Sequence, residues 1–367
     1  MKRFTDLAEV GREQVLELLA LARRLEAQPD PRALVGKVLG LLFMNPSLRT
    51  LASFQAGMAR LGGASFVITP GQGTWQLETR DGVVMNGAAA EHIREGLPTL
   101  ASYCDVMGIR AFAEGKDLAT DLAETRFNAM AALVHKPLIN LESAMNHPCQ
   151  ALADWKSLDE LALPARARFV LSWVPHPRAL PLAVPAATVH MAAMRGMEVV
   201  VLRPEGFALP AAVMNAARSA AAASGGSVQE TADRDAALAG AHIVYAKEWG
   251  STTHYGDEPA DQRLRGAQGA YGRELVSPVH DHCLSILPMK AAGAAQPSAP
   301  ACGCRPGAAR CCAGHRALRR RSRSCGAPAG NASGGNRRRR ARRIHRAGTS
   351  PGARRAAAGR RVRRRSA

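Results

Sequence analysis

Residues 43–50 combine two hydroxyl side chains with one guanidinium where a predicted strand turns into a helix. An apolar run ends at Phe43, and Ser47 then opens a helical pattern. The N–H groups and the dipole at a helix start favour an anion, and Arg49 can bind phosphate oxygens through two parallel hydrogen bonds. The segment therefore predicts a phosphate site. Its simpler interpretation, a helix N-cap beside a solvated arginine, stays open at this point.

A second group of residues with useful chemistry occupies positions 147–154. His147 precedes a helical pattern that begins at Pro148, and Gln150 follows three residues after the histidine. A histidine and an amide in this arrangement suit hydrogen-bond donation to a carbonyl oxygen that gains negative charge. The alternative is a structural histidine followed by a proline at the first helical position.

Alternating strand-like and helix-like segments must position these residues. The expected strands are residues 37–43, 64–69, 106–109, 137–140, 168–173, 197–202 and 242–245, and the helix-length segments include 47–61, 179–195 and 210–224. Residues 1–28 space their apolar side chains as one face of a surface helix, which excludes a secretory signal. This alternation predicts an α/β fold with parallel, doubly wound sheets.

The chain's net charge of +19 is concentrated at its C-terminal end. Residues 291–367 contain 21 arginines but no lysine and no acidic residue, so the first 290 residues hold 28 basic and 30 acidic groups. The body is near neutral, which excludes a nucleic-acid-binding surface spread over the whole chain. Its three separated cysteines and the absence of a long uncharged, proline-free run predict a reduced, cytoplasmic protein that does not enter a membrane.

Residues 291–367 have no aromatic side chain with which to build a core, so we expect this tail to be disordered. Its Arg, Ala, Gly and Pro are typical of GC-rich coding sequence read out of frame, and we interpret the tail as derived from a frameshift. One competing interpretation is a basic arm that binds nucleic acid through phosphate contacts. If the tail is instead derived from a frameshift, any binding of nucleic acid would be incidental. Another is a metal knuckle formed by Cys302, Cys304, Cys311, Cys312 and His315, although that spacing fits no common zinc pattern.

Four segments, in this order along the chain, resemble the aspartate/ornithine carbamoyltransferase family. They are Phe-x-x-x-Ser-x-Arg-Thr at 43–50, Gly-Ile-Arg at 108–110, His-Pro-x-Gln-x-Leu-x-Asp at 147–154 and His-Cys-Leu at 282–284. The resemblance spans residues 1–290 and implies the family's two doubly wound parallel-sheet domains. We expect a carbamoyl-phosphate-binding domain at 1–155 and an acylornithine-binding domain at 156–290, followed by the tail at 291–367. The family also implies a homotrimer with shared sites and a reaction without metal or organic cofactor.

Within the family, the chain is most similar to the carbamoyltransferases for N-acetylornithine and N-succinylornithine. Residues 73–78, 173–180 and 245–250 carry this similarity. It implies transfer of the carbamoyl group of carbamoyl phosphate to the side-chain amine of N-acetyl-L-ornithine, which gives N-acetyl-L-citrulline and phosphate in arginine biosynthesis. The alternatives are an N-succinylornithine carbamoyltransferase, or a catalytically impaired protein of this fold whose tail binds nucleic acid.

The resemblance assigns roles residue by residue. Carbamoyl phosphate would be bound by Ser47, Leu48, Arg49, Thr50, Trp75, Arg110, His147 and Gln150. Arg110, His147 and Gln150 would polarise its carbonyl, and Trp75 would reach into the site of a neighbouring subunit. Cys283 would complete a catalytic set with Arg110, His147 and Gln150. It would face the attacking amine, as would the Leu284 carbonyl.

The expected acceptor site adds three residues. Glu142 and Lys247 would lie near the amino-acid substrate, and Ala90 stands where acetyl-type relatives carry glutamate and succinyl-type relatives carry proline. Alanine matches neither type. Loss of the glutamate would remove repulsion against a succinyl carboxylate, but N-acetylornithine stays our first expectation.

Three features of the sequence depart from the family pattern. Leu51 stands where a second arginine is common, and Ala186 and Ala187 replace an asparagine-serine pair. After Leu284 the family continues with Pro-x-Arg-Arg and a helix that packs on the first domain, whereas this chain runs into its basic tail. We therefore expect an exposed apolar groove on the first domain.

Overall fold

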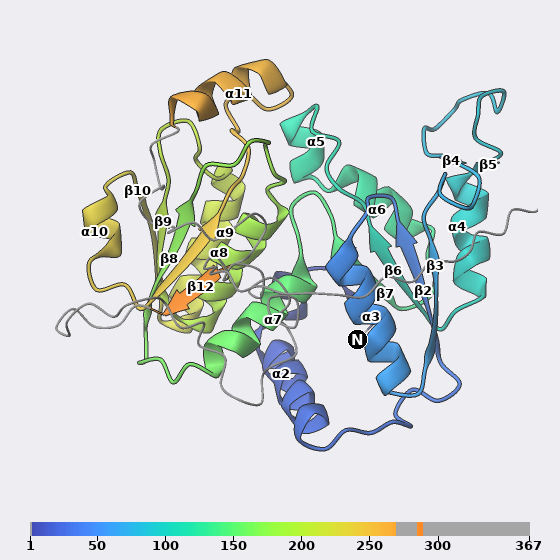
Figure 1. Ribbon diagram of the computed structural model, residues 1–367, viewed down its shortest axis with the longest axis horizontal. Coiled ribbons are helices and arrows are strands. Elements are labelled where there is room, and N and C mark those ends of the chain that lie inside the picture. The colour runs from blue at the N-terminus through green and yellow to red at the C-terminus, as the bar shows by residue number, and fades with distance from the viewer. Residues whose placement is uncertain (1, 269–284, 289–367) are drawn as a thin grey trace, which may run out of the picture. The chain divides into compact units, whose positions relative to one another are not determined.

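A computed structural model describes residues 2–268 and 285–288 of the protein (Figure 1). Two of the expected site residues, Cys283 and Leu284, lie outside the described residues, and so does the tail at 291–367 with its proposed metal knuckle. None of the helices in the described ranges combines the length and the apolar character that a bilayer crossing requires.

The first sheet is parallel throughout and has the strand order β1-β7-β6-β2-β3. Its strands are β1 (Arg3–Phe4), β2 (Val38–Phe43), β3 (Ala64–Ile68), β6 (Val106–Arg110) and β7 (Leu138–Glu142). Leu39 and Leu41 of β2 pack with residues of α3 (Leu48–Arg60), while Leu42 packs with residues of α4 (Ile93–Ser102) and α6 (Thr125–Ala132). Helices thus cover both faces, which is why β2 is a continuous apolar run.

The second sheet has the order β10-β9-β8-β11-β12. Its strands are β8 (Arg168–Trp173), β9 (Glu198–Leu202), β10 (Ser227–Thr231), β11 (Ile243–Lys247) and β12 (Ser285–Pro288), of which β12 runs antiparallel to β11. One face packs on α8 (Ala183–Arg195) and α9 (Ala211–Ser224), and the other on α10 (Arg234–Leu238). The predicted α/β class is confirmed, with one sheet that is parallel throughout and a second that is parallel except for β12.

We call the elements from β1 to β7 the first lobe and those from β8 to β12 the second lobe. Helix α7 (Pro148–Asp159) connects them. Trp155 and Leu158 of this helix belong to the same buried cluster as Phe169 of β8. The helix that begins at His147 is therefore packed against the second lobe.

The N-terminal segment differs from the single helix expected over residues 1–28. It forms β1, α1 (Leu7–Val10) and α2 (Arg12–Ala27), with Gly11 between the two helices at φ 81°. Glycine reaches this left-handed region without strain, so the chain can turn there. Strands β10 and β12 were also not expected. Both lie at sheet edges, and β10 is mostly polar.

An apolar groove of about 400 Å³ lies on the first lobe. Its lining includes Phe54 of α3, Ile139 of β7 and Leu152 of α7, with Leu18 of α2. A groove of this kind was expected from the departure of the C-terminal sequence. The chain that follows Pro288 lies outside the described residues.

Candidate active site

The predicted phosphate loop is a strand-to-helix junction in the structure. Ser47 is the N-cap of α3: its backbone is extended, with φ −154° and ψ 126°, and its Oγ accepts a hydrogen bond from the Thr50 N–H at 3.2 Å. Leu48 is 84% exposed, and Arg49 is also exposed. Capping by Ser47 is thus confirmed, and it is compatible with anion binding because a capped helix start keeps its positive dipole end.

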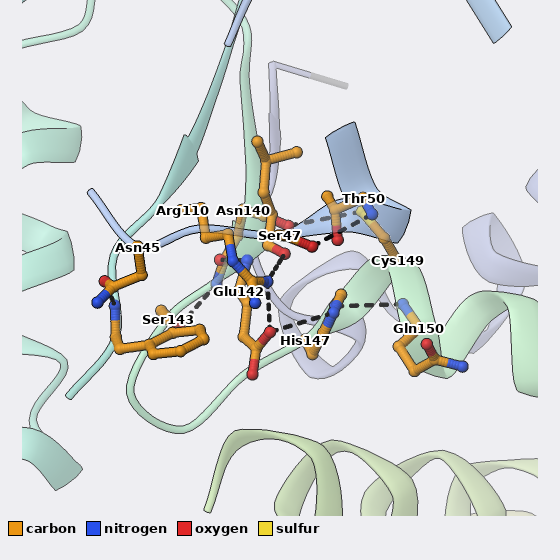
Figure 2. Close-up of polar contacts among 12 residues, drawn as sticks. Asn45, Ser47, Thr50, Arg110, Asn140, Glu142, Ser143, His147, Cys149 and Gln150 are labelled. Atoms are coloured by element: carbon orange, nitrogen blue, oxygen red, sulfur yellow. Dashed lines mark hydrogen bonds and ion pairs between the residues drawn. The ribbon is translucent and has the colours of Figure 1, made fainter. Parts of the chain in front are cut away.

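Arg110, Glu142 and His147 meet at the carboxyl ends of β6 and β7 (Figure 2). A register shift at Ile109 and Arg110 sets Arg110 opposite Glu142, as β-bulges beside functional sites often do. Arg110 Nη1 donates to Glu142 Oε2, and His147 Nε2 lies 3.4 Å from the same oxygen. Arg110 and Glu142 are 7% exposed and His147 is 8% exposed. Two nitrogen donors from different elements therefore converge at one buried point.

His147 is neutral and serves as the N-cap of α7. Its Nδ1 accepts a hydrogen bond from the Gln150 N–H at 3.4 Å. Burial, with the nearby charge of Arg110, lowers the pKa of His147 to about 3. A neutral imidazole that accepts at Nδ1 carries its proton on Nε2, so His147 offers a hydrogen-bond donor and does not act as an acid at neutral pH.

The Arg110 guanidinium is held on several sides. Its Nη1 also donates to the Leu141 carbonyl at 3.4 Å, and its central carbon lies 4.5 Å from the ring centroid of Phe112. Its Nε is buried and has no hydrogen-bond partner among the described residues. Because native proteins rarely leave a buried donor unsatisfied, this nitrogen points to a function.

Glu124 anchors the loop that leads to His147. Its carboxylate accepts hydrogen bonds from the Ser143 hydroxyl at 2.6 Å and from the Ala144 and Met145 N–H groups at 3.0 and 2.9 Å. Glu124 has left-handed backbone geometry, with φ 53° and ψ 31°. A non-glycine residue in this region carries strain, which the surrounding hydrogen bonds offset. No sequence motif singled out Glu124.

Gln150 is hydrogen-bonded to a buried carboxylate one helical turn further along α7. Its Nε2 donates to Asp154 Oδ1 at 2.8 Å, and the Tyr245 hydroxyl donates to Asp154 Oδ2 at 3.0 Å. Burial raises the pKa of Asp154 to about 6, so the group is ionised at neutral pH. Tyr245 belongs to β11 of the second lobe and was not expected at the site.

Lys247, at the end of β11, lies close enough to Glu142 for each charge to affect the other. Burial lowers the pKa of Lys247, and the charge of Glu142 opposes that shift while the charge of Arg49 adds to it. Burial likewise raises the pKa of Glu142, against the effects of Arg110 and Lys247. The structure therefore brings together the two residues expected near the amino-acid substrate.

A buried network of two carboxyl groups and one arginine supports the next part of the second lobe. Glu248 Oε2 accepts from the Leu180 N–H at 2.8 Å, and Glu248 Oε1 lies 3.4 Å from Arg265 Nε. Arg265 also pairs with Asp261 on the same helix, α11 (Glu258–Ala267). Burial raises the pKa of Glu248 to about 8. The network fixes the loop that contains Leu180, just before α8.

Trp75 and Ala90 lie on a different part of the first lobe. They belong to the segment between β3 and α4 that contains β4 (Leu77–Glu78) and β5 (Glu91–His92). Trp75 is 61% exposed, and its Nε1 donates to Glu91 Oε2 at 3.0 Å. Among the described residues, no hydrogen bond or ion pair links Trp75 to Arg110 or His147. An exposed Trp75 is compatible with a role at a neighbouring subunit, which stays a prediction.

Two of the departures from the family pattern have a packing role. Leu51 lies against the buried cluster formed by β2 and β7, so its side chain takes part in the core of the first lobe. Ala186 and Ala187 are buried on α8, within the core of the second lobe. All three are apolar side chains in apolar surroundings.

Two family descriptions match most of the described chain. The aspartate/ornithine carbamoyltransferase carbamoyl-P binding domain matches residues 2–160, and the Asp/Orn binding domain matches residues 184–272. The N-acetylornithine carbamoyltransferase of Xanthomonas campestris pv. campestris is 35% identical over 269 residues, which cover 72% of this chain and 79% of that protein. The N-succinylornithine carbamoyltransferase of Bacteroides thetaiotaomicron is 34% identical over 257 residues, or 69% and 76% of the two chains.

Solved structures give the same result for the fold. An acetylornithine transcarbamylase in complex with acetylcitrulline superimposes with a TM-score of 0.69 at 34% identity, covering 73% of this chain and 81% of that chain. A variant of N-acetyl-L-ornithine transcarbamylase with a glutamate replaced by proline, in complex with carbamyl phosphate and N-succinyl-L-norvaline, also has a TM-score of 0.69, at 35% identity and the same coverage.

Proposed function

Because this chain belongs to the aspartate/ornithine carbamoyltransferase family, we propose that it transfers the carbamoyl group of carbamoyl phosphate to the side-chain amine of N-acetyl-L-ornithine. The products are N-acetyl-L-citrulline and phosphate, and the reaction belongs to arginine biosynthesis. Carbamoyl transfer follows from the family, whereas the choice of N-acetylornithine as the acceptor is our proposal.

The observation that carries the proposal is the convergence of Arg110 and His147 at one buried point. A guanidinium and an imidazole Nε2–H, each near the same Glu142 oxygen, form a pair of preorganised donors. In the reaction, the carbonyl oxygen of carbamoyl phosphate accepts from these donors, and its charge grows as the amine attacks. Donors that are already oriented in a buried site stabilise that charge strongly.

The leaving phosphate is assigned to the start of α3. The uncharged amine uses its lone pair to form a bond to the carbamoyl carbon, and the bond from that carbon to the phosphate oxygen breaks. Phosphate takes the bonding electrons and receives the proton that the amine loses. Arg49 and the backbone N–H groups at the start of α3, close to Ser47 and Thr50, bind the phosphate oxygens.

The acceptor amino acid is assigned to Lys247 and Glu142. The Lys247 ammonium suits the carboxylate of an acylornithine, and the Glu142 carboxylate suits its side-chain amine. Cys283 and the Leu284 carbonyl complete the acceptor site in this proposal, and the family's homotrimer brings Trp75 of a neighbouring subunit to the carbamoyl phosphate site.

N-succinylornithine is a second candidate acceptor, and Ala90 favours it. Variants of N-acetyl-L-ornithine transcarbamylase with a glutamate replaced by proline or by alanine form complexes with N-succinyl-L-norvaline. We assign Ala90 to the equivalent position, where a small uncharged side chain leaves room for a succinyl carboxylate. Identities of 35% and 34% to the acetyl and succinyl enzymes do not separate the two acceptors.

A direct assay tests both candidates. The purified chain is incubated with carbamoyl phosphate and one acceptor, which is N-acetylornithine, N-succinylornithine or ornithine in three parallel reactions. The citrulline derivative formed in each reaction is measured. We expect turnover of acylornithines but not of ornithine. Ala90→Glu should lower kcat/KM for N-succinylornithine more than for N-acetylornithine, because a new carboxylate repels the succinyl group. Equal loss for both acceptors would contradict the role of Ala90, and absence of turnover with every acceptor would contradict the proposed function.

A further inference from the structure

Asp154 connects the helix that carries Gln150 to the strand that carries Lys247. Its two oxygens accept hydrogen bonds from Gln150 Nε2 at 2.8 Å and from the Tyr245 hydroxyl at 3.0 Å. Asp154 is 4% exposed and Tyr245 is 0% exposed. Water therefore competes little for either bond, and the low local dielectric strengthens both.

Asp154 determines which way the Gln150 amide faces. A terminal amide has a donor nitrogen and an acceptor oxygen, and the two orientations occupy nearly the same volume. An ionised carboxylate only accepts hydrogen bonds, so it selects the orientation with Nε2 toward Asp154. The oxygen, Oε1, then lies on the other side of the amide group.

Tyr245 holds Asp154 from the second lobe. The Thr188 hydroxyl of α8 is hydrogen-bonded to the same phenol. Thr188 is 1% exposed. Because alternate residues of a strand share a face, Tyr245 lies on the same face of β11 as Lys247. The strand face that carries one expected acceptor ligand thus also supports a residue of the carbamoyl phosphate site.

We propose that Asp154 and Tyr245 are positioning residues, which keep the Gln150 amide oxygen toward carbamoyl phosphate, where it accepts a hydrogen bond from the carbamoyl NH2 group. The inference rests on the proposed function. It replaces the donor role that the resemblance implied for Gln150. An acceptor at this point distinguishes a carbamoyl group from the methyl group of an acyl phosphate such as acetyl phosphate, which has no N–H to donate.

Two phosphonates of nearly equal size isolate this contact. Phosphonoacetamide ends in CO–NH2 and 2-oxopropylphosphonate ends in CO–CH3, while inorganic phosphate reports on the anion site only. By titration calorimetry, we expect the wild-type protein to bind the amide about tenfold more tightly than the ketone, as one buried hydrogen bond would give. Asp154→Asn should remove most of this preference, and Tyr245→Phe should reduce it about threefold. Phosphate affinity should not change in either variant.

Tyr255 offers a matched control. Its hydroxyl donates to Asp121 Oδ2 at 2.7 Å, so Tyr255→Phe removes the same kind of hydrogen bond from a carboxylate that, among the described residues, has no hydrogen bond to Gln150. It should leave the preference for the amide unchanged. Gln150→Leu sets the lower limit of the preference, and adding Asp154→Asn to it should have no further effect. Thermal unfolding of each variant verifies that it is folded.

The outcomes separate the two levels of inference. If folded Asp154→Asn and Tyr245→Phe proteins keep the full preference for the amide, the positioning role is wrong and the proposed function is unaffected. If affinity for all three ligands falls together in these variants, the pair has a general structural role and the inference is likewise overturned. If the wild-type protein binds phosphate but neither phosphonate, the proposed carbamoyl phosphate site is wrong, and the inference fails with it.

Discussion

In the first lobe the buried pair Arg110 and Glu142 ends two neighbouring strands, whereas in the second lobe a buried network joins the residue after β11 to α11. Arg110 and Glu142 face each other through the local register of β6 and β7. Glu248, Asp261 and Arg265 instead form a network between a strand end and a separate helix. The first arrangement needs only two adjacent strands, while the second depends on how a distant helix is packed.

The difference matters for function. The first lobe aims donors at one point through backbone geometry, helix caps and the Glu124 anchor. The second lobe fixes a loop, the segment around Leu180, through a carboxylate that accepts from its backbone N–H. Under the proposed assignment, local geometry sets the carbamoyl phosphate side, and longer-range packing sets the acceptor side.

The largest expected effect comes from Arg110→Met. It removes a donor from the reacting carbonyl and leaves Glu142 buried without its partner, so we expect kcat to fall about 10²–10³-fold and stability to fall by about 3–5 kcal/mol. Steady-state assays and urea unfolding measure these changes. Adding Glu142→Gln should recover stability but not activity. Lys37 forms an exposed ion pair with Asp105, so Lys37→Met is the control. We expect this variant to lose less than about 1 kcal/mol of stability and to keep its activity unchanged.

Arg265→Met tests the network of the second lobe. It leaves the Asp261 carboxylate buried without its cation and removes the partner of Glu248, so we expect a loss of about 3 kcal/mol in the free energy of unfolding. Because the network holds the loop at Leu180, KM for the acylornithine should rise more than KM for carbamoyl phosphate. Equal effects on both values of KM would contradict the assignment of this network to the acceptor side.

Arg49→Ala should weaken carbamoyl phosphate and phosphate binding by about 10–100-fold, since a charged hydrogen bond to a phosphate is lost. Stability should change little because the side chain is exposed. Arg60→Ala, at the other end of α3, is the matched control and should bind both ligands as the wild type does. Undiminished affinity in folded Arg49→Ala protein would mean that the phosphate lies elsewhere.

The two lobes should differ in how pH affects their stability. The pKa of His147 is lowered from 6.5 to about 3, so its contribution is fully present above pH 6.5 and is lost as the pH falls through 3. The pKa of Glu248 is raised from 4.5 to about 8, so its contribution is fully present below pH 4.5 and is lost as the pH rises through 8. His147→Gln and Glu248→Gln should flatten opposite limbs of the stability profile, each by about 1–2 kcal/mol. If each variant instead changed stability by the same amount at every pH, so that the slope of its profile stayed as in the wild type, this account would be contradicted.

Trp75→Ala should have the smallest effect on stability, within about 0.5 kcal/mol, because the side chain is mostly exposed. Its activity should nevertheless fall if Trp75 completes a neighbouring site. Mixing inactive Trp75→Ala and Arg49→Ala proteins should then restore some activity through hybrid sites, while Tyr103→Ala, another exposed aromatic, should stay active alone. No recovery after demonstrated subunit exchange would count against a shared site.

Much of the fold followed from local patterns in the chain. Apolar runs predicted the central strands, since a strand covered on both faces must be apolar along its length. The start of α3 and the start of α7 were also predictable, because Ser47 and His147 satisfy backbone groups only a few residues away. The split at Gly11 and the edge strand β10 were missed, because a glycine inside an apolar period and a polar edge strand carry weak signals.

The candidate site likewise has one part that the sequence predicted and one part that it did not. Residue types alone pointed to residues 43–50 as an anion site and to His147 and Gln150 as hydrogen-bonding groups, whereas Arg110 was assigned through the resemblance to the family. Only the tertiary structure brought Lys247 near Glu142 and Tyr245 to Asp154, which are 91 residues apart in the chain. Such pairs depend on how a strand of one lobe packs against a helix that starts in the other. A local pattern of residues cannot specify that packing, so the orientation of Gln150 became visible only in the folded chain.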